Sequence, residues 1–396
     1  GAGAVSRLSQ IEGTDIIALC DLNPERIANS QKTLKSSGRK EAIVYSGEED
    51  WKKMCERDDI DLIYNATPWE LHVPIALYAM DHGKHVAIEV PAALTIKDCW
   101  ALVDKAEEKQ LHCMMLENCC YDFFELATLN MARKGVLGEI IHTEGAYIHD
   151  LRQEKFDGYY KHWRLEYSKY HTGNPYPTHG LGPIAQILGI NQGDRMEYLS
   201  SVSTNQYGLA LYAKDKLKND ERITQSERYM LGDMNTTIIR TSKGKSIMIQ
   251  HDTTSPRPYS RIHLVQGTNG MAVKYPDEKV ALQPSSHEFL KEGDQKELLS
   301  KYEHPLSKYI GEKAKKVGGH GGMDFIMDWR LIYCLQNGYP LDQSVYDAAA
   351  WSSIVELSER SVQNKSTSVA IPDFTRGAWE NYQPWPVIDM EKTLHG

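Results

Sequence analysis

The stretch Asp61-Leu-Ile-Tyr-Asn-Ala-Thr-Pro-Trp-Glu-Leu-His72, with the later Gly83-Lys-His-Val-Ala-Ile-Glu-Val-Pro91, decides the fold. Each segment holds a short apolar run, which predicts buried strands at 62–65 and 85–88. Residues 69–82 have helical spacing, and Gly83 supplies the stop that helices commonly use. A strand, a crossover helix and a second strand are the unit from which parallel sheets are built.

The same rhythm extends over the first 120 residues. Further strands are expected at 16–20 and 112–116, and further helices at 23–35 and 95–109, the last with Thr95 as its N-cap. We therefore predict an α/β fold with a Rossmann-type doubly wound parallel sheet in residues 1–120. The strand that should precede the first helix is absent from the chain as given.

From about Gly138 the pattern changes to strands without regular helices between them. We expect residues 121–396 to form an α+β substrate domain with a largely antiparallel sheet. Between these strands, residues 150–194 are rich in Tyr, His, Gly and Pro, which indicates a functional loop with helical pieces. The strand candidates are 139–147, 198–204, 236–241, 246–252 and 262–266.

Composition excludes several classes of partner. The net charge of −9 argues against nucleic acid and anionic membranes, because both require a positive patch. No apolar run approaches the roughly 18 residues that span a bilayer. The seven cysteines include no C-x-x-C pair, so no metal site is expected. The first residues, Gly1-Ala-Gly-Ala4, do not reveal the compartment. A small molecule or a glycan remains as the substrate class.

A dinucleotide site is indicated at the N-terminus. Gly1 and Gly3 precede a short helical run, and Asp21 follows the next predicted strand. Glycines let the backbone approach a pyrophosphate at a helix N-terminus, and the carboxylate accepts hydrogen bonds from the adenosine ribose. A carboxylate there disfavours a 2′-phosphate, so NAD is expected rather than NADP.

Segments 61–72 and 83–91 resemble the Gfo/Idh/MocA superfamily of NAD-dependent oxidoreductases. Its members carry a Glu-Lys-Pro where this chain has Glu89-Val90-Pro91. The lysine of the dehydrogenases helps to move the proton of the substrate hydroxyl. Val90 therefore argues against ordinary alcohol oxidation by that residue.

The chain also resembles one branch of this superfamily, glycoside hydrolase family 109, whose founding activity is α-N-acetylgalactosaminidase. The resemblance covers nearly the whole chain and implies NAD as cofactor, and it is compatible with export to the periplasm or cell surface of a bacterium. The motifs that carry it are 115–121, 145–152, 173–183, 190–194, 251–259, 318–324 and 371–375. The NAD ligands that it implies, together with the two glycines, are Asp21, Trp69, His72, Glu89, Val90, Asn118 and Tyr176. The implied substrate pocket consists of Tyr147, Arg164, Tyr176, Pro177, Thr178, His179 and Tyr259.

These residue types suit a sugar on chemical grounds, because aromatic rings pack on a pyranose while Arg, His and Tyr bind its polar groups. The resemblance implies oxidation at C3 of the sugar, elimination across C1 and C2, addition of water and return of the hydride to C3. Tyr147 and His179 are the leading candidates for proton transfer, with Tyr176 and Tyr259 as positioning donors. Glu117 is a further catalytic candidate, which could instead orient other groups.

Two other functions stay open at the level of sequence. A sugar dehydrogenase of the same superfamily would release NADH, and a sugar or NAD sensor would bind without turnover. His149 and His320 are as compatible with a structural role as with a functional one. An open antiparallel sheet could also be covered by a second copy of the chain in a homo-oligomer.

Overall fold

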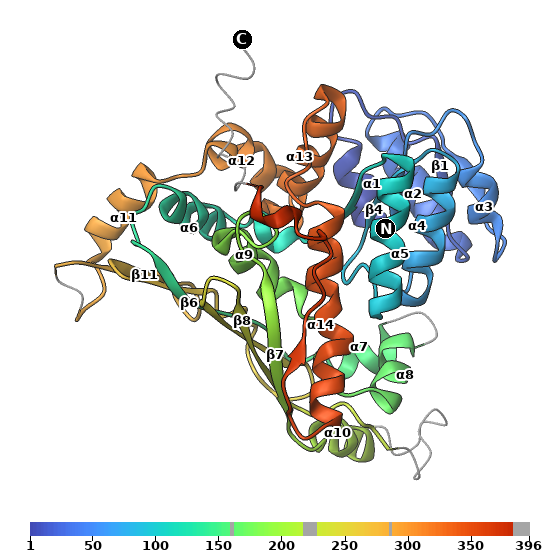
Figure 1. The fold of residues 1–396 in the computed structure, drawn as a ribbon. Helices are drawn as coiled ribbons and strands as arrows, with labels where there is room; N and C mark the ends of the chain where they lie inside the picture. The colour runs from blue at the N-terminus through green and yellow to red at the C-terminus, as the bar shows by residue number, and fades with distance from the viewer. Residues whose placement is uncertain (159–161, 217–227, 285–286, 383–396) are drawn as a thin grey trace. The chain divides into compact units, whose positions relative to one another are not determined.

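The computed structural model describes residues 1–158, 162–216, 228–284 and 287–382 (Figure 1). Two compact units divide the chain. Unit 1 contains residues 1–126 and 303–349, and unit 2 contains residues 127–302 and the segment that begins at 350. Residues 303–349 thus pack with the N-terminal part, whereas the sequence patterns placed them with the second domain. The division into an NAD-binding domain at 1–120 and a substrate-binding domain at 121–396 remains a prediction.

Unit 1 is built on parallel strands in two hydrogen-bonded sets. β1 (Ala18–Cys20) pairs with β2 (Ile43–Tyr45), and β3 (Leu62–Asn65), β4 (His85–Ile88) and β5 (Cys113–Met115) form the other set in that order. In the usual doubly wound order 3-2-1-4-5-6, the strand before the first helix lies between such sets. Sequence patterns missed β2, which is three residues long and mostly exposed.

Local capping explains where the helices of this unit begin. The Asn23 side chain accepts hydrogen bonds from the backbone N of Glu25 and Arg26, and Pro24 occupies the first helical position of α2 (Pro24–Ser36). Thr95 caps α5 (Ile96–Lys109) through the backbone N of Asp98, as predicted. The remaining helical segments are α1 (Ala2–Leu8), α3 (Asp50–Cys55), η1 (Trp69–Leu71), α4 (His72–Asp81), η2 (Asn118–Tyr121), α12 (Pro305–Val317), η4 (His320–Gly322) and α13 (Met323–Asn337).

Unit 2 is organised around an eight-stranded sheet. Figure 1 labels its strands β6, β7 and β8. Its order is β12-β11-β10-β6-β9-β8-β7-β13, and all its pairs are antiparallel except β6 with β9. The expected largely antiparallel sheet is therefore confirmed. The strands are β6 (Ile140–Ile148), β7 (Met196–Ser203), β8 (Asn235–Thr241), β9 (Ser246–Asp252), β10 (Leu264–Gly267), β11 (Gly270–Val273), β12 (Lys279–Leu282) and β13 (Val369–Ala370).

Helices of unit 2 form part of the predicted functional loop. α7 (Arg152–Asp157), α8 (Trp163–Tyr170) and α9 (Thr178–Leu188) all lie within the segment 150–194, and α9 lies against β6 (Figure 1). α6 (Phe123–Arg133) and α14 (Val345–Gln363) cross the division between the units. The others are α10 (Gly208–Lys216), α11 (Glu292–Lys301) and η5 (Ala378–Glu380). Within the described residues, none of the helices combines the length and apolar character that a bilayer span requires.

Candidate functional site

The carboxyl end of β1 carries Asp21, the residue predicted to bind the adenosine ribose. Its Oδ1 accepts a hydrogen bond from the backbone N of Asn23 at 2.8 Å, and a carboxylate has further acceptor positions for ribose hydroxyls. Gly1 occupies the N-cap of α1, where no side chain caps the helix, and Gly3 lies in its first turn. Backbone donors beside a strand-end carboxylate are the groups that the adenosine half of NAD needs.

Two predicted NAD ligands join the loops that follow β3 and β4. The indole Nε1 of Trp69 donates to the carbonyl oxygen of Val90 at 3.1 Å. In His72, Nδ1 lies 2.8 Å from the carbonyl oxygen of Pro91 and Nε2 lies 2.9 Å from that of Thr67. His72 is only 1% exposed. These two side chains therefore set the shape of the sheet edge at which ligands bind in α/β folds.

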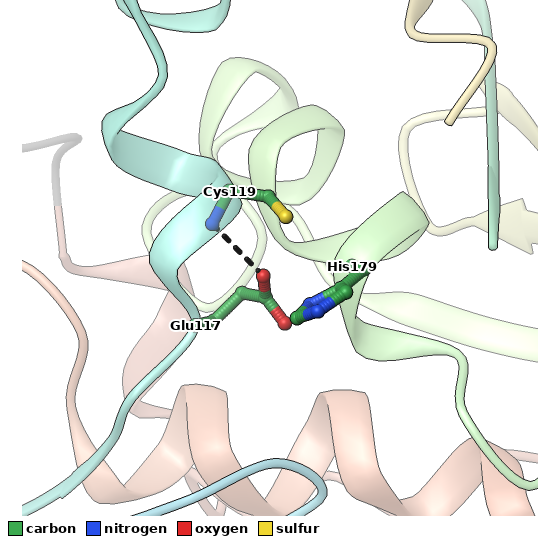
Figure 2. Close-up of side chains that lie close together, drawn as sticks. All are labelled: Glu117, Cys119 and His179. Carbon is green, nitrogen blue, oxygen red and sulfur yellow. Dashed lines mark hydrogen bonds between the residues drawn. The ribbon is translucent and has the colours of Figure 1, made fainter. Parts of the chain in front are cut away.

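Glu117 lies at the end of β5, completely buried. Its carboxylate accepts a hydrogen bond from the backbone N of Cys119 at 3.1 Å and so caps η2 (Figure 2). Its backbone N donates to Gln343 Oε1 at 3.3 Å, and its carbonyl oxygen accepts from Gln343 Nε2 at 2.9 Å. This geometry supports the orienting role for Glu117, since the residue holds the turn on which Asn118 lies.

Asn118 belongs to a buried polar network that the sequence did not reveal. Its Nδ2 donates to Asp324 Oδ1 at 2.6 Å, and His320 Nδ1 lies 2.9 Å from Asp324 Oδ2. Burial by itself would raise the pKa of Asp324, but hydrogen bonds from His320 and Asn118, with the charge of Arg7, hold it below its usual value. Asp324 is thus an ionised carboxylate that accepts from the predicted NAD ligand.

In unit 2, the predicted substrate residues gather around Tyr147 on β6. The ring centre of Tyr147 lies 4.5 Å from that of Tyr176 and 5.2 Å from that of His179. The guanidinium carbon of Arg164, on α8, lies 5.0 Å from the ring centre of Tyr176. His149 stands between Tyr147 and Tyr259, with ring centres at 4.6 and 5.1 Å. We call these six residues the tyrosine–histidine cluster: Tyr147, His149, Arg164, Tyr176, His179 and Tyr259.

Hydrogen bonds tie the loop before α9 to α14, and this attachment holds Tyr176 and His179 beside Tyr147. Asn174 donates its backbone N to Ser358 Oγ at 2.9 Å and accepts from the backbone N of Tyr176 through Oδ1 at 3.0 Å. Thr172 donates its backbone N to Glu359 Oε1 at 3.0 Å. Pro177 then forms the N-cap of α9, and Thr178 is its fully buried first residue.

The surroundings of Tyr147 favour the neutral form of two histidines, His149 and His251. Burial, with the charges of His179 and Arg164 nearby, lowers the pKa of His149 to about 4. His251 pairs with Tyr147 across β9 and β6, and burial followed by the charge of Lys155 holds its pKa well below the usual value. A neutral imidazole has one donor and one acceptor, so these rings can serve hydroxyl groups in either direction.

Lys155 is a buried lysine whose burial the sequence does not predict. The residue is 4% exposed, and its Nζ donates to Ser168 Oγ at 3.0 Å between α7 and α8. Burial, with the charge of Arg164, lowers its pKa to about 7. The only signal in the sequence is its position in the polar segment 150–194, which surface lysines share.

A parallel Rossmann-type unit and a mixed-sheet second unit define the class of NAD-binding oxidoreductase folds, and the comparisons agree. Residues 3–117 match the family model "Oxidoreductase family, NAD-binding Rossmann fold", so the predicted fold class and the NAD cofactor are confirmed. Residues 121–381 match "Glycosyl hydrolase 109, C-terminal domain". The chain therefore belongs to glycosyl hydrolase family 109, as its motifs indicated.

Curated relatives extend over nearly the entire chain. The chain is 54% identical to an alpha-N-acetylgalactosaminidase of Bacteroides fragilis, with 96% of this chain and 90% of the relative covered. It is 50% identical to a glycosyl hydrolase family 109 protein of Porphyromonas gingivalis, with coverage of 96% and 83%.

Solved structures share the fold at much lower identity. A levoglucosan dehydrogenase in complex with NADH and levoglucosan matches with a TM-score of 0.69 at 19% identity, covering 94% of this chain and 96% of that chain. A scyllo-inositol dehydrogenase from Lactobacillus casei, with bound NAD(H) and scyllo-inositol, gives 0.64 at 12% identity, covering 93% and 95%. The fold is thus that of sugar and polyol dehydrogenases, while the sequence family is that of glycosidases.

Proposed function

We propose that this protein hydrolyses terminal N-acetylhexosaminides, with α-N-acetylgalactosaminides as its main substrates. It regenerates its NAD in each turnover. The name of the Bacteroides fragilis relative and the glycosidase family support the substrate class. The NAD-binding domain supports the cofactor.

The observation that carries the mechanism is the composition of the tyrosine–histidine cluster. Most glycosidases need two carboxylates on either side of the scissile bond, and NAD-dependent families are exceptions. The six residues of the cluster comprise three tyrosines, two histidines and an arginine. Such a set can transfer protons and hold hydroxyl groups, but it does not supply the carboxylate nucleophile of the usual scheme.

NAD⁺, when bound, would accept a hydride from C3 of the sugar and give it back at the end of the turnover, while the proton of the C3 hydroxyl leaves to solvent and returns from it. With C3 at the ketone level, the proton on C2 becomes acidic, and Tyr147 or His179 would remove it. The aglycone then leaves C1 with its bonding electrons and takes a proton from the other residue. Water adds to C1, a proton returns to C2, and C3 returns to the alcohol level, so the net reaction is hydrolysis. Tyr147 and His179 are thus the two candidates for the base at C2, and the one that is not the base would act as the acid.

The remaining residues of the cluster would bind the sugar. Arg164 has donors for the acetamido oxygen, and Tyr176 and Tyr259 would pack against the ring and donate to its hydroxyls. Tyr259 is 40% exposed, so its ring is accessible to a ligand.

Turnover of p-nitrophenyl α-N-acetylgalactosaminide in D₂O tests the elimination step. We expect p-nitrophenol release together with one deuterium at C2 of the sugar product. Hydrolysis without deuterium at C2 would contradict the mechanism, while the substrate assignment would stand. A panel of aryl α- and β-N-acetylhexosaminides, with and without added NAD⁺, tests the sugar and the anomer.

The competing dehydrogenase function differs in its cofactor balance. A dehydrogenase would produce NADH in proportion to the sugar consumed, and absorbance at 340 nm would rise accordingly. A hydrolase that regenerates NAD should show p-nitrophenol release without that stoichiometric rise. Binding of both ligands without turnover would instead favour a sensor.

A further inference from the structure

We propose that Asp324 is a positioning residue that locks the amide of Asn118 so that its oxygen, not its nitrogen, accepts from the carboxamide NH₂ of NAD. The inference rests on the proposed contact between Asn118 and NAD. It concerns binding rather than turnover, and so it can be tested apart from the glycosidase reaction.

The orientation of Asn118 follows from its two neighbours. Nδ2 lies 2.6 Å from Asp324 Oδ1, and an ionised carboxylate can only accept hydrogen bonds. On the other side, Cys119 Sγ approaches Asn118 Oδ1 at 3.5 Å as a weak donor. Both contacts direct Nδ2 of Asn118 toward Asp324. Oδ1 of Asn118 then keeps a second lone pair that can accept a hydrogen bond from NAD.

Asp324 itself is held from several directions. His320 Nδ1 contacts its Oδ2 at 2.9 Å, and Arg7 Nη1 lies 3.4 Å from the same oxygen. The carboxylate is largely buried, at 9% side-chain exposure. Rotating the Asn118 amide would place its oxygen against this carboxylate, and two buried acceptors in contact are strongly unfavourable.

The network also includes the first helix. Arg7 of α1 donates from Nε to Asp328 Oδ2 at 2.6 Å, and Tyr64 donates its hydroxyl to Asp328 Oδ1 at 3.0 Å. Asp324 and Asp328 are one turn apart on α13, so the helix that positions Asn118 also anchors α1. Tyr64 contacts Asp328 and not Asp324, which provides a control within the same network.

The test compares three dinucleotides bound to the full chain, by calorimetry or by competition against NADH fluorescence. In 3-acetylpyridine adenine dinucleotide a methyl replaces the NH₂, whereas thionicotinamide adenine dinucleotide keeps the NH₂. In the wild type we expect the acetylpyridine analogue to bind about fivefold to tenfold more weakly than NAD⁺, the loss of roughly one hydrogen bond. The thionicotinamide analogue should follow NAD⁺ in every variant.

In Asp324→Asn, the new amide can donate to Asn118, so the lock is lost and the discrimination between NAD⁺ and the acetylpyridine analogue should fall to near unity. Asn118→Ala should have the same effect with Asp324 intact, which covers the case that Asp324→Asn does not fold. Tyr64→Phe should shift both dissociation constants together and keep their ratio.

Three results would overturn the proposal. The first is a wild-type protein that binds both dinucleotides equally well. The second is an unchanged ratio in Asp324→Asn or in Asn118→Ala. The third is a collapse of the ratio in Tyr64→Phe, because loosening of the whole network would then explain the effect. Each result is read from binding, whatever the outcome of the hydrolysis assays.

Discussion

Gly145 of β6 and Gly180 of α9 are in direct backbone contact: a Cβ on Gly145 would lie 2.2 Å from the carbonyl oxygen of Gly180. The reverse also holds, since a Cβ on Gly180 would lie 2.4 Å from the backbone N of Ala146. Tyr147 follows one glycine by two residues, and His179 directly precedes the other. This close approach therefore brings the two proposed proton-transfer residues together.

Gly145→Ala should separate α9 from β6 and disturb the pair Tyr147 and His179. Backbone atoms cannot yield as a flexible side chain can, so we expect a loss of unfolding free energy of about 1–3 kcal/mol, typical of overpacking. Hydrolytic activity should fall by more than the fraction of unfolded protein explains. Gly293→Ala is the matched control, because a Cβ there meets nothing within 4 Å and the residue lies in α11. A fully active Gly145→Ala protein would show that the contact does not position the site.

Tyr147→Phe keeps the ring and removes only the hydroxyl. If Tyr147 transfers a proton, kcat should fall by about 10²- to 10⁴-fold while the melting temperature changes little. Tyr212→Phe is the control, since Tyr212 packs against the separate apolar cluster around Phe156 and should retain activity. A loss of less than tenfold in Tyr147→Phe would mean that the Tyr147 hydroxyl acts neither as the base at C2 nor as the acid for the aglycone, which contradicts its proposed role.

Arg164→Lys keeps the charge but loses the planar guanidinium above Tyr176. Lysine provides neither the fork of donors nor the stacking, so kcat/KM for an aryl N-acetylgalactosaminide should fall by about tenfold, mainly through KM. Arg152→Lys is a close match, because Arg152 also covers a ring, that of Tyr212 at 5.1 Å. The same loss in both variants would mean that the stacking is structural in each case.

The sequence predicted those elements whose signals are local. β3, β4 and β9 have the predicted bounds, and Thr95 caps α5 as expected, because apolar runs and capping residues act within a few positions. The order of several motifs along the chain also indicated glycoside hydrolase family 109, which the match over residues 121–381 confirmed. The motifs alone point to Tyr147, Tyr176 and His179 as site residues, and the structure brings these three side chains into one cluster.

The features that sequence patterns missed depend on distant contacts. Asp324 meets Asn118 across 206 positions of the chain, and neither residue has a local signal for the other. The burial of Lys155 results from the packing of α7 against α8, and a lysine in a polar segment ordinarily indicates a solvated side chain. The contact between Gly145 and Gly180 is of the same kind, since a glycine alone does not reveal which backbone approaches it.

Lys155 should make the stability of the protein depend on pH above neutrality. Burial, with the charge of Arg164, lowers its pKa to about 7 in the folded protein, whereas an unfolded lysine titrates near 10.4. Between these values the unfolded chain binds a proton that the folded protein does not, so this group makes stability rise with pH. Below about pH 7 both states are protonated, and the contribution no longer changes.

Lys155→Met should remove that rise. The slope for one group cannot exceed about 1.4 kcal/mol per pH unit, so the wild type should gain about 1.5 kcal/mol relative to the variant between pH 7.5 and 9. Urea unfolding of both proteins across that range measures the difference, in which the other titrating groups largely cancel. Lys214→Met, on the exposed side of α10, should leave the wild-type pH dependence intact. Parallel stability curves of Lys155→Met and the wild type above pH 7 would contradict this prediction. Lys155 would then stay charged in the folded protein, and its Nζ would need a further hydrogen-bond acceptor besides Ser168 Oγ.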